Sequence, residues 1–128
     1  MLALLDRYLL GEPVSKPVLL STLLSERSSL PAAAPFYRAL EAVGVRAADE
    51  AFIALRLVLA GREPSDDAVR HLRALGALAR AAAQDDAAAV KTLLRKEGTA
   101  LDLEPPGAPF DGAAYGATVR AAYGRALV

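Results

Sequence analysis

The side chains that most often perform catalysis are scarce in this chain. It contains no cysteine and no asparagine, one glutamine (Gln84) and one histidine (His71). Catalysis commonly draws on a nucleophile, a general base and polar groups that converge on one pocket. Because there is a single imidazole and the carboxylates are spread along the sequence, we expect a protein that is not an enzyme and that holds no cofactor and no metal ion.

His71 is the only candidate for a general base or an imidazole metal ligand. It falls on the flank of the apolar face of a predicted helix, and no second histidine or cysteine exists to complete a metal pair. We therefore predict a packed or half-buried structural histidine, with a pH-sensitive contact or a phosphoacceptor as the alternative. The adjacent acids Asp85 and Asp86 are interpreted as a helix cap, because acidic residues at helix N-termini are common.

Charge and composition limit the partners of this chain. Its 128 residues are 54% hydrophobic, enough for one domain with its own core. Fifteen basic and fifteen acidic residues cancel overall, and they also cancel within each half, which weakens nonspecific binding to nucleic acid or anionic lipid. No apolar run approaches the ~20 residues needed to span a bilayer, and the start is a poor signal peptide. We expect a cytoplasmic protein without membrane contact.

Alanine and leucine, which are strong helix formers, dominate the sequence and predict an all-α fold. The apolar periodicity indicates a single domain, a compact bundle of about six or seven helices. Residues 1–98 form the predicted helical core, 99–111 an extended proline-rich strap, and 112–127 the C-terminal helix. Residues 47–60 are apolar almost all round, as in helices with neighbours on several sides, so we predict them as the central helix with the 65–97 hairpin packed against it.

The predicted C-terminal helix has two faces of different character. The tetrapeptide Ala-Ala-Tyr-Gly occurs at 113–116 and again at 121–124. Eight residues make about two helical turns, so Tyr115 and Tyr123 share a face with Val119 between them. A neighbouring face carries small residues, and its three glycines would destabilise an isolated helix by roughly 0.8–1 kcal/mol each relative to alanine. We therefore expect another helix to pack closely there.

The leading hypothesis from the sequence is a non-enzymatic protein–protein interaction module, which binds another chain or self-associates through its C-terminal helix. Tyrosine is enriched in binding hot spots, and a strap followed by a tyrosine-bearing helix can dock onto a partner as readily as onto its own core. The alternative is that this helix completes the core of the monomer. The predicted interface residues are Phe110, Tyr115, Gly116, Val119 and Tyr123.

The second hypothesis is a nucleic-acid-binding protein. Residues 17–45 resemble a helix-turn-helix, in which the start of the second helix reads bases in the major groove. An arginine stripe on the predicted helix 65–83 could also contact phosphates. Nucleic acid is the disfavoured partner, because the base-reading positions 32–34 are alanines, which donate no side-chain hydrogen bond. The candidate contacts are Arg27, Arg38, Arg70 and Arg73.

Overall fold

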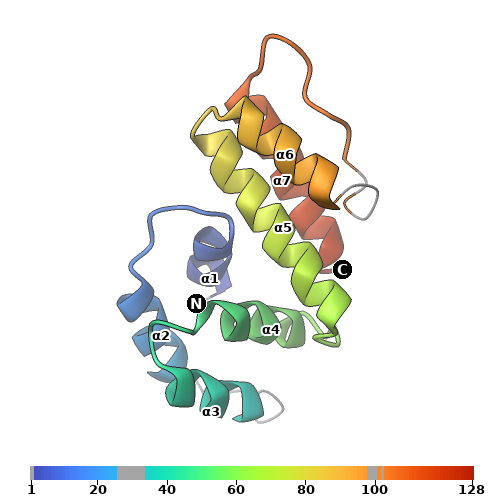
Figure 1. The fold of residues 1–128 in the computed structure, drawn as a ribbon. Helices are drawn as coiled ribbons and strands as arrows, with labels where there is room; N and C mark the ends of the chain where they lie inside the picture. Colours follow the sequence, from blue (N-terminus) through green and yellow to red (C-terminus); the bar gives the residue numbers. More distant parts are fainter. Residues whose placement is uncertain (1, 26–33, 98–100, 102) are drawn as a thin grey trace.

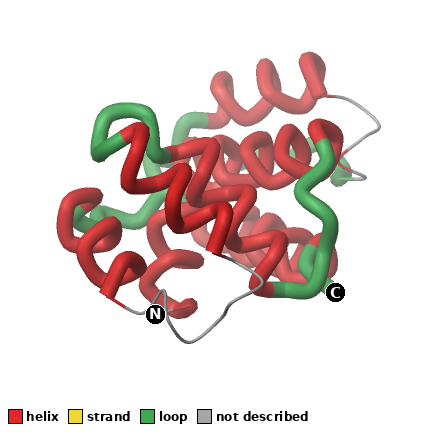
Figure 2. The backbone as a smooth tube through the Cα atoms, turned by 90° about the horizontal axis from the view of Figure 1, so that it is seen from below, coloured by secondary structure: helices red, strands yellow, loops and turns green. Residues whose placement is uncertain are grey.

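A computed structural model of the chain describes residues 2–25, 34–97, 101 and 103–128. Within these ranges the chain forms seven α-helices and no strand, as the composition predicts, and the helices pack into one compact fold (Figures 1 and 2). In chain order they are α1 (Leu2–Leu9), α2 (Lys16–Ser25), α3 (Ala34–Val43), α4 (Asp49–Leu59), α5 (Asp66–Ala83), α6 (Ala87–Glu97) and α7 (Gly112–Ala126).

The buried side chains form two clusters, one among α1 to α4 and one among α5 to α7. Helix α4 takes part in both: Phe52 and Leu55 belong to the first cluster, whereas Ile53 and Leu57 belong to the second. Every residue of α4 after Glu50 is buried or half-buried. This agrees with the prediction for a helix without a polar face.

Helix α5 joins the two halves of the fold. It contacts α6 and α7 in the C-terminal half, and α1 and α4 in the N-terminal half (Figure 1). Ser65 caps it by accepting a hydrogen bond from the backbone nitrogen of Ala68 at 3.2 Å. Helices α1 and α5 approach closely at Gly76, since a Cβ atom there would lie 2.3 Å from the carbonyl oxygen of Leu9. The central position predicted for residues 47–60 alone is therefore shared with α5.

The start of α7 is held from two sides. Asp111 is its N-cap and accepts a hydrogen bond from the backbone nitrogen of Ala114 at 3.2 Å. Asp85, in the turn after α5, accepts a hydrogen bond from the backbone nitrogen of Gly112, also at 3.2 Å. A Cβ atom at Gly112 would lie 2.2 Å from the carbonyl oxygen of Ala82. The predicted close packing against the glycines of this helix is thus confirmed at Gly112.

Asp86, the residue after Asp85, has a different role. Asp86 caps α6, as predicted, by accepting a hydrogen bond from the backbone nitrogen of Ala89 at 3.0 Å. Capping therefore accounts for one member of the acidic pair. The other member, Asp85, connects the α5–α6 turn to α7 and was not distinguished by the sequence pattern.

Residues 103–111 contain no helix and lead the chain to the start of α7, which lies at the C-terminal end of α5 (Figure 1). Leu101 is buried in the second cluster, and the half-buried Leu103 and Phe110 pack against that cluster. At the other end of α7, Arg62 Nη1 donates to the carbonyl oxygens of Ala126 at 3.2 Å and Val128 at 2.9 Å. A cation at this end also interacts favourably with the helix dipole.

Gly76 and Gly124 form a pair of helical glycines in contrasting surroundings. Nothing lies within 4 Å of a Cβ atom at Gly124, so the expected helix packing against the small residues is wrong at that position. We expect Gly76→Ala to lower the free energy of unfolding by about 1–3 kcal/mol through overpacking against Leu9. Gly124→Ala should raise it by about 0.5–1 kcal/mol, because alanine loses less backbone entropy. Urea unfolding followed by circular dichroism measures both, and changes of the same sign would contradict the close α1–α5 contact.

Candidate functional site

The tyrosine face of α7 points into the core of the chain itself. Tyr115, Val119 and Tyr123 retain 9%, 0% and 4% exposure, and they belong to the cluster that α7 shares with α5. Gly116 is buried on the same helix, and the ring of Phe110 lies 6.0 Å from the ring of Tyr115. The C-terminal helix therefore packs against its own chain, and the residues predicted for an interface are buried there, except for the half-buried Phe110.

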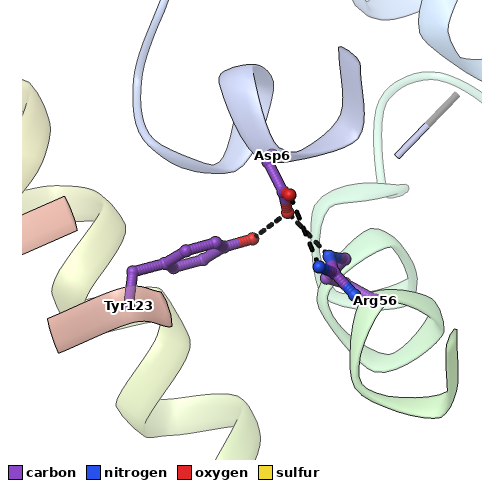
Figure 3. Close-up of polar contacts among 3 residues, drawn as sticks. All are labelled: Asp6, Arg56 and Tyr123. Atoms are coloured by element: carbon purple, nitrogen blue, oxygen red, sulfur yellow. Dashed lines mark hydrogen bonds and ion pairs between the residues drawn. The ribbon is translucent and has the colours of Figure 1, made fainter. Parts of the chain in front are cut away.

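A partly buried ion pair joins α1 to α4, and a tyrosine hydroxyl connects it to α7 in the other half of the fold (Figure 3). Arg56 on α4 donates from Nε to Asp6 Oδ1 at 2.6 Å and from Nη2 to Asp6 Oδ2 at 3.4 Å. The hydroxyl of Tyr123 donates to the same Oδ1 atom at 2.6 Å. The Arg56 side chain is only 12% exposed, and low local polarity strengthens such contacts. We call this arrangement the clasp, because it ties α1, α4 and α7 together.

The clasp holds the proton of Tyr123 tightly. Burial of the ring, its hydrogen bond to Asp6 and the negative charge of Asp6 raise the pKa of Tyr123 far above its ordinary value, and Arg56 opposes this rise only in part. The phenol therefore stays neutral in the folded protein and acts as a hydrogen-bond donor. The role of Tyr123 that follows from this geometry is to position α7.

The clasp was not among the predicted site residues, although the sequence carries a signal for it. Arg56 is the only charge between residues 51 and 60, and Asp6 interrupts the apolar segment 2–10. A charge within a buried segment needs a partner to offset its lost hydration. The identity of that partner depends on tertiary packing, because Asp6 and Tyr123 are 117 positions apart.

A cleft of about 470 Å³ lies between residues 103–111 and α7. The hydroxyl of Tyr115 lies 3.4 Å from the carbonyl oxygen of Glu104 and links the two walls. One wall carries prolines and the other carries small or charged side chains of α7. The principal lining residues are Pro105, Pro106 and Pro109 on the first wall and Ala114, Thr118 and Arg125 on the second.

Two arginines of the nucleic-acid hypothesis have acidic neighbours. Arg70 Nη2 lies 3.9 Å from Asp67 Oδ1, and Arg73 Nη2 lies 3.6 Å from Glu50 Oε1. These carboxylates offset positive potential on the outer face of α5, whereas phosphate binding relies on that potential.

The remaining parts of that hypothesis lie in the N-terminal half. Arg38 is exposed on α3. Helix α2 ends at Ser25 and α3 begins at Ala34. Arg27 and the base-reading positions 32 and 33 lie outside the described residues.

His71 is half-buried, as predicted, and lines a separate cavity of about 180 Å³ near Arg62 and Ala126. Among the described residues, no group of three histidine, aspartate or glutamate side chains could hold a metal ion. None of the described helices is long and apolar enough to cross a membrane.

No protein-family model, curated protein or solved structure matches this chain. The geometry of the cleft and of the clasp is therefore the basis for any functional inference. The clasp lies inside the fold and joins its halves, whereas the cleft opens to the surface. Of the two, the cleft is the one that a partner can reach.

The hydroxyl of Tyr123 can be removed without changing the packing of its ring. A hydrogen bond to a charged group is worth about 1.5–3 kcal/mol, so we expect Tyr123→Phe to lower the free energy of unfolding at neutral pH by about 1.5 kcal/mol. Tyr115→Phe is the matched control, since that hydroxyl makes a long contact with a neutral carbonyl and its loss should cost less than about 1 kcal/mol. Equal losses in chemical denaturation would contradict the importance of the clasp.

Alkaline pH provides an independent measurement of the clasp. The folded state binds the Tyr123 proton more tightly than the unfolded chain does. The resulting stabilisation is complete below about pH 10, the ordinary pKa of tyrosine, and is lost as the pH rises above it. The loss reaches at most about 1.4 kcal/mol per pH unit. Tyr123→Phe lacks the titrating group, so the stability difference between wild type and variant should shrink above about pH 10; a constant difference would argue against the raised pKa.

Proposed function

We propose that this chain is a non-enzymatic helical module that binds an extended segment of another protein in the cleft between residues 103–111 and α7. The observation that carries the proposal is the cleft itself. Its volume of about 470 Å³ lies within the range of roughly 300–1,000 Å³ that is typical of binding clefts. The single histidine lines a different cavity.

The α7 wall of the cleft follows one face of the helix. Ala114, Thr118 and Arg125 are spaced by four and then seven residues, which places them on a single stripe. Ala114 and Thr118 are exposed, and their small side chains leave room for the side chains of a partner. A segment lying along this stripe would contact α7 from its first turn to its last.

The opposite wall is stiffened by proline. Pro105, Pro106 and Pro109 restrict the backbone and lack N–H groups, so this wall loses little conformational freedom when a partner binds. The bond between the Tyr115 hydroxyl and the carbonyl of Glu104 holds the wall against α7. A cleft with walls arranged in advance can bind an extended segment at a reduced entropic cost.

The two ends of the cleft carry side chains of opposite charge. Asp111 lies at the start of α7, and the backbone of Glu104 contacts Tyr115 in the first turn. Arg125 lies in the last turn of the same helix. A partner segment with a basic residue near Asp111 and an acidic residue near Arg125 would be complementary, and such rim charges mainly determine orientation and association rate.

The proposed partner is another protein rather than a second copy bound through the tyrosine face. Tyr115, Val119 and Tyr123 are covered by α5, so presenting them to another copy would expose the second core cluster. Light scattering of the purified chain should therefore report a monomer. Binding through the cleft leaves that core intact.

Selection from a peptide display library tests the proposal, with Ala114→Arg and Ala117→Arg as matched variants. Both alanines are exposed on α7, but only Ala114 lines the cleft. We expect peptides selected on the wild-type protein to bind Ala114→Arg about tenfold or more weakly, because the long side chain fills the cleft and repels basic residues. Ala117→Arg should retain the wild-type affinity.

Circular dichroism spectra of the two variants are the control for the helical fold, which both variants should keep. The proposal fails if no peptide is enriched, or if the selected peptides bind both variants with the same affinity. Equal weakening by Ala117→Arg would place the binding surface elsewhere on α7.

A further inference from the structure

A second cavity, of about 260 Å³, lies where α1, α4 and α5 meet. We call it the junction pocket. Its apolar surface comes from the buried Ile53 and Leu72, the half-buried Leu9 and the backbone at Gly76. Neither the clasp residues nor the walls of the cleft line it, so it is separate from the site proposed above.

Asp49, the acidic residue that lines the junction pocket, already has two partners in the fold. Asp49 lies 3.2 Å from the Nζ atom of Lys16, and it accepts a hydrogen bond from the hydroxyl of Tyr8. The charge of Lys16 opposes the repulsion that this carboxylate would exert on a bound anion.

The two arginines of the pocket differ in their partners. Arg73 is paired with Glu50 at 3.6 Å. Arg80 has no carboxylate within ion-pair distance among the residues that the structure describes. Seven residues separate the two arginines, which corresponds to about 10 Å along α5. The uncompensated charge of the pocket is therefore positive and belongs to Arg80.

The guanidinium of Arg80 lies close enough to influence Tyr8, which also lines the pocket. Burial, the hydrogen bond to Asp49 and the charge of Asp49 raise the pKa of Tyr8 to about 12, and the positive charge of Arg80 lowers it in part. Such an effect needs the two groups to be near each other. Tyr8 and Arg80 both line the pocket, so Arg80 is placed to meet a ligand that enters beside Tyr8.

We propose that the junction pocket binds a small organic anion, a carboxylate attached to an apolar body. The carboxylate pairs with Arg80, whose planar guanidinium matches it with two parallel hydrogen bonds. The apolar body lies against Ile53 and Leu72. The volume is somewhat below the roughly 300 Å³ at which typical drug-sized cavities begin, so a short aliphatic chain or a single ring is the best fit.

Binding in this position has a measurable consequence for the whole fold. The pocket is built from helices of both core clusters. A ligand that binds the folded chain and not the unfolded chain raises the midpoint of thermal unfolding, and the rise grows with the logarithm of ligand concentration above Kd. The unfolding midpoint and the NMR shifts of the amides at the pocket therefore report the same binding event.

Sodium octanoate is the probe for the experiment, followed in amide correlation NMR spectra of the wild-type protein. We expect saturable shifts of the amides of Ile53, Gly76 and Ala77 together with a raised unfolding midpoint. Acetate lacks the apolar body and octanol lacks the charge. Each should bind about tenfold or more weakly than octanoate, because each retains only one of the two interactions.

Variants of Arg80 identify the group that holds the carboxylate. Arg80→Gln keeps the Cβ atom that packs beside Gly11 but removes the charge, and should weaken octanoate binding by about tenfold. Arg80→Lys keeps the charge but not the two parallel hydrogen bonds, and should give an affinity between those of wild type and Arg80→Gln. Arg120→Gln changes an exposed arginine on α7 and should leave the affinity unchanged.

Three results would overturn the proposal. The first is an absence of saturable shifts at the pocket amides, and the second is octanol binding as tightly as octanoate. The third is equal octanoate affinity of wild type and Arg80→Gln. Should Arg80→Gln disturb the fold, the comparison of octanoate, acetate and octanol on the wild-type protein still decides between the outcomes.

Discussion

The packing of α5 against both halves of the chain is the constraint on which the rest of the structure depends. Aromatic residues make up 5% of the chain, so large rings cannot fill the space between helices. Dispersion contacts must then come from helices that approach one another closely. Gly76 against the Leu9 carbonyl and Gly112 against the Ala82 carbonyl are two points where this approach leaves no room for a Cβ atom.

Close apolar packing does not by itself determine how the helices are oriented. Contacts between alanine and leucine faces are non-directional, so one helix can rotate or slide against another at small cost. The clasp removes that freedom, because Asp6 can accept from both Arg56 and Tyr123 only when α1, α4 and α7 are in register. A buried ion pair adds little net stability but is costly to break. We interpret the clasp as a device that fixes orientation.

Local signals in the sequence predicted the fold class and the cap at Asp86, while contacts between distant residues escaped prediction. Asp86 is recognisable as a cap because capping involves residues within one helical turn. The eight-residue spacing of Tyr115 and Tyr123 correctly indicated a shared face. Periodicity does not show whether a partner or the chain's own α5 covers that face. Docking on a partner and packing in the chain's own core were therefore equally consistent with this pattern. The pairing of Asp6 with Arg56 depends on the tertiary fold in the same way.

The scarcity of large side chains that brings the helices together also explains where cavities remain. Alanine and glycine allow close contact along a helix pair, yet they cannot fill a corner where three elements meet. Such a corner is a binding site only if a group at its rim binds a ligand more favourably than it binds water. Arg80 meets this condition, because the apolar surface of Ile53 and Leu72 excludes water from one side of a carboxylate paired with it and so strengthens that pair. The tyrosine face of α7 fails the same condition, since α5 already fills the space in front of it.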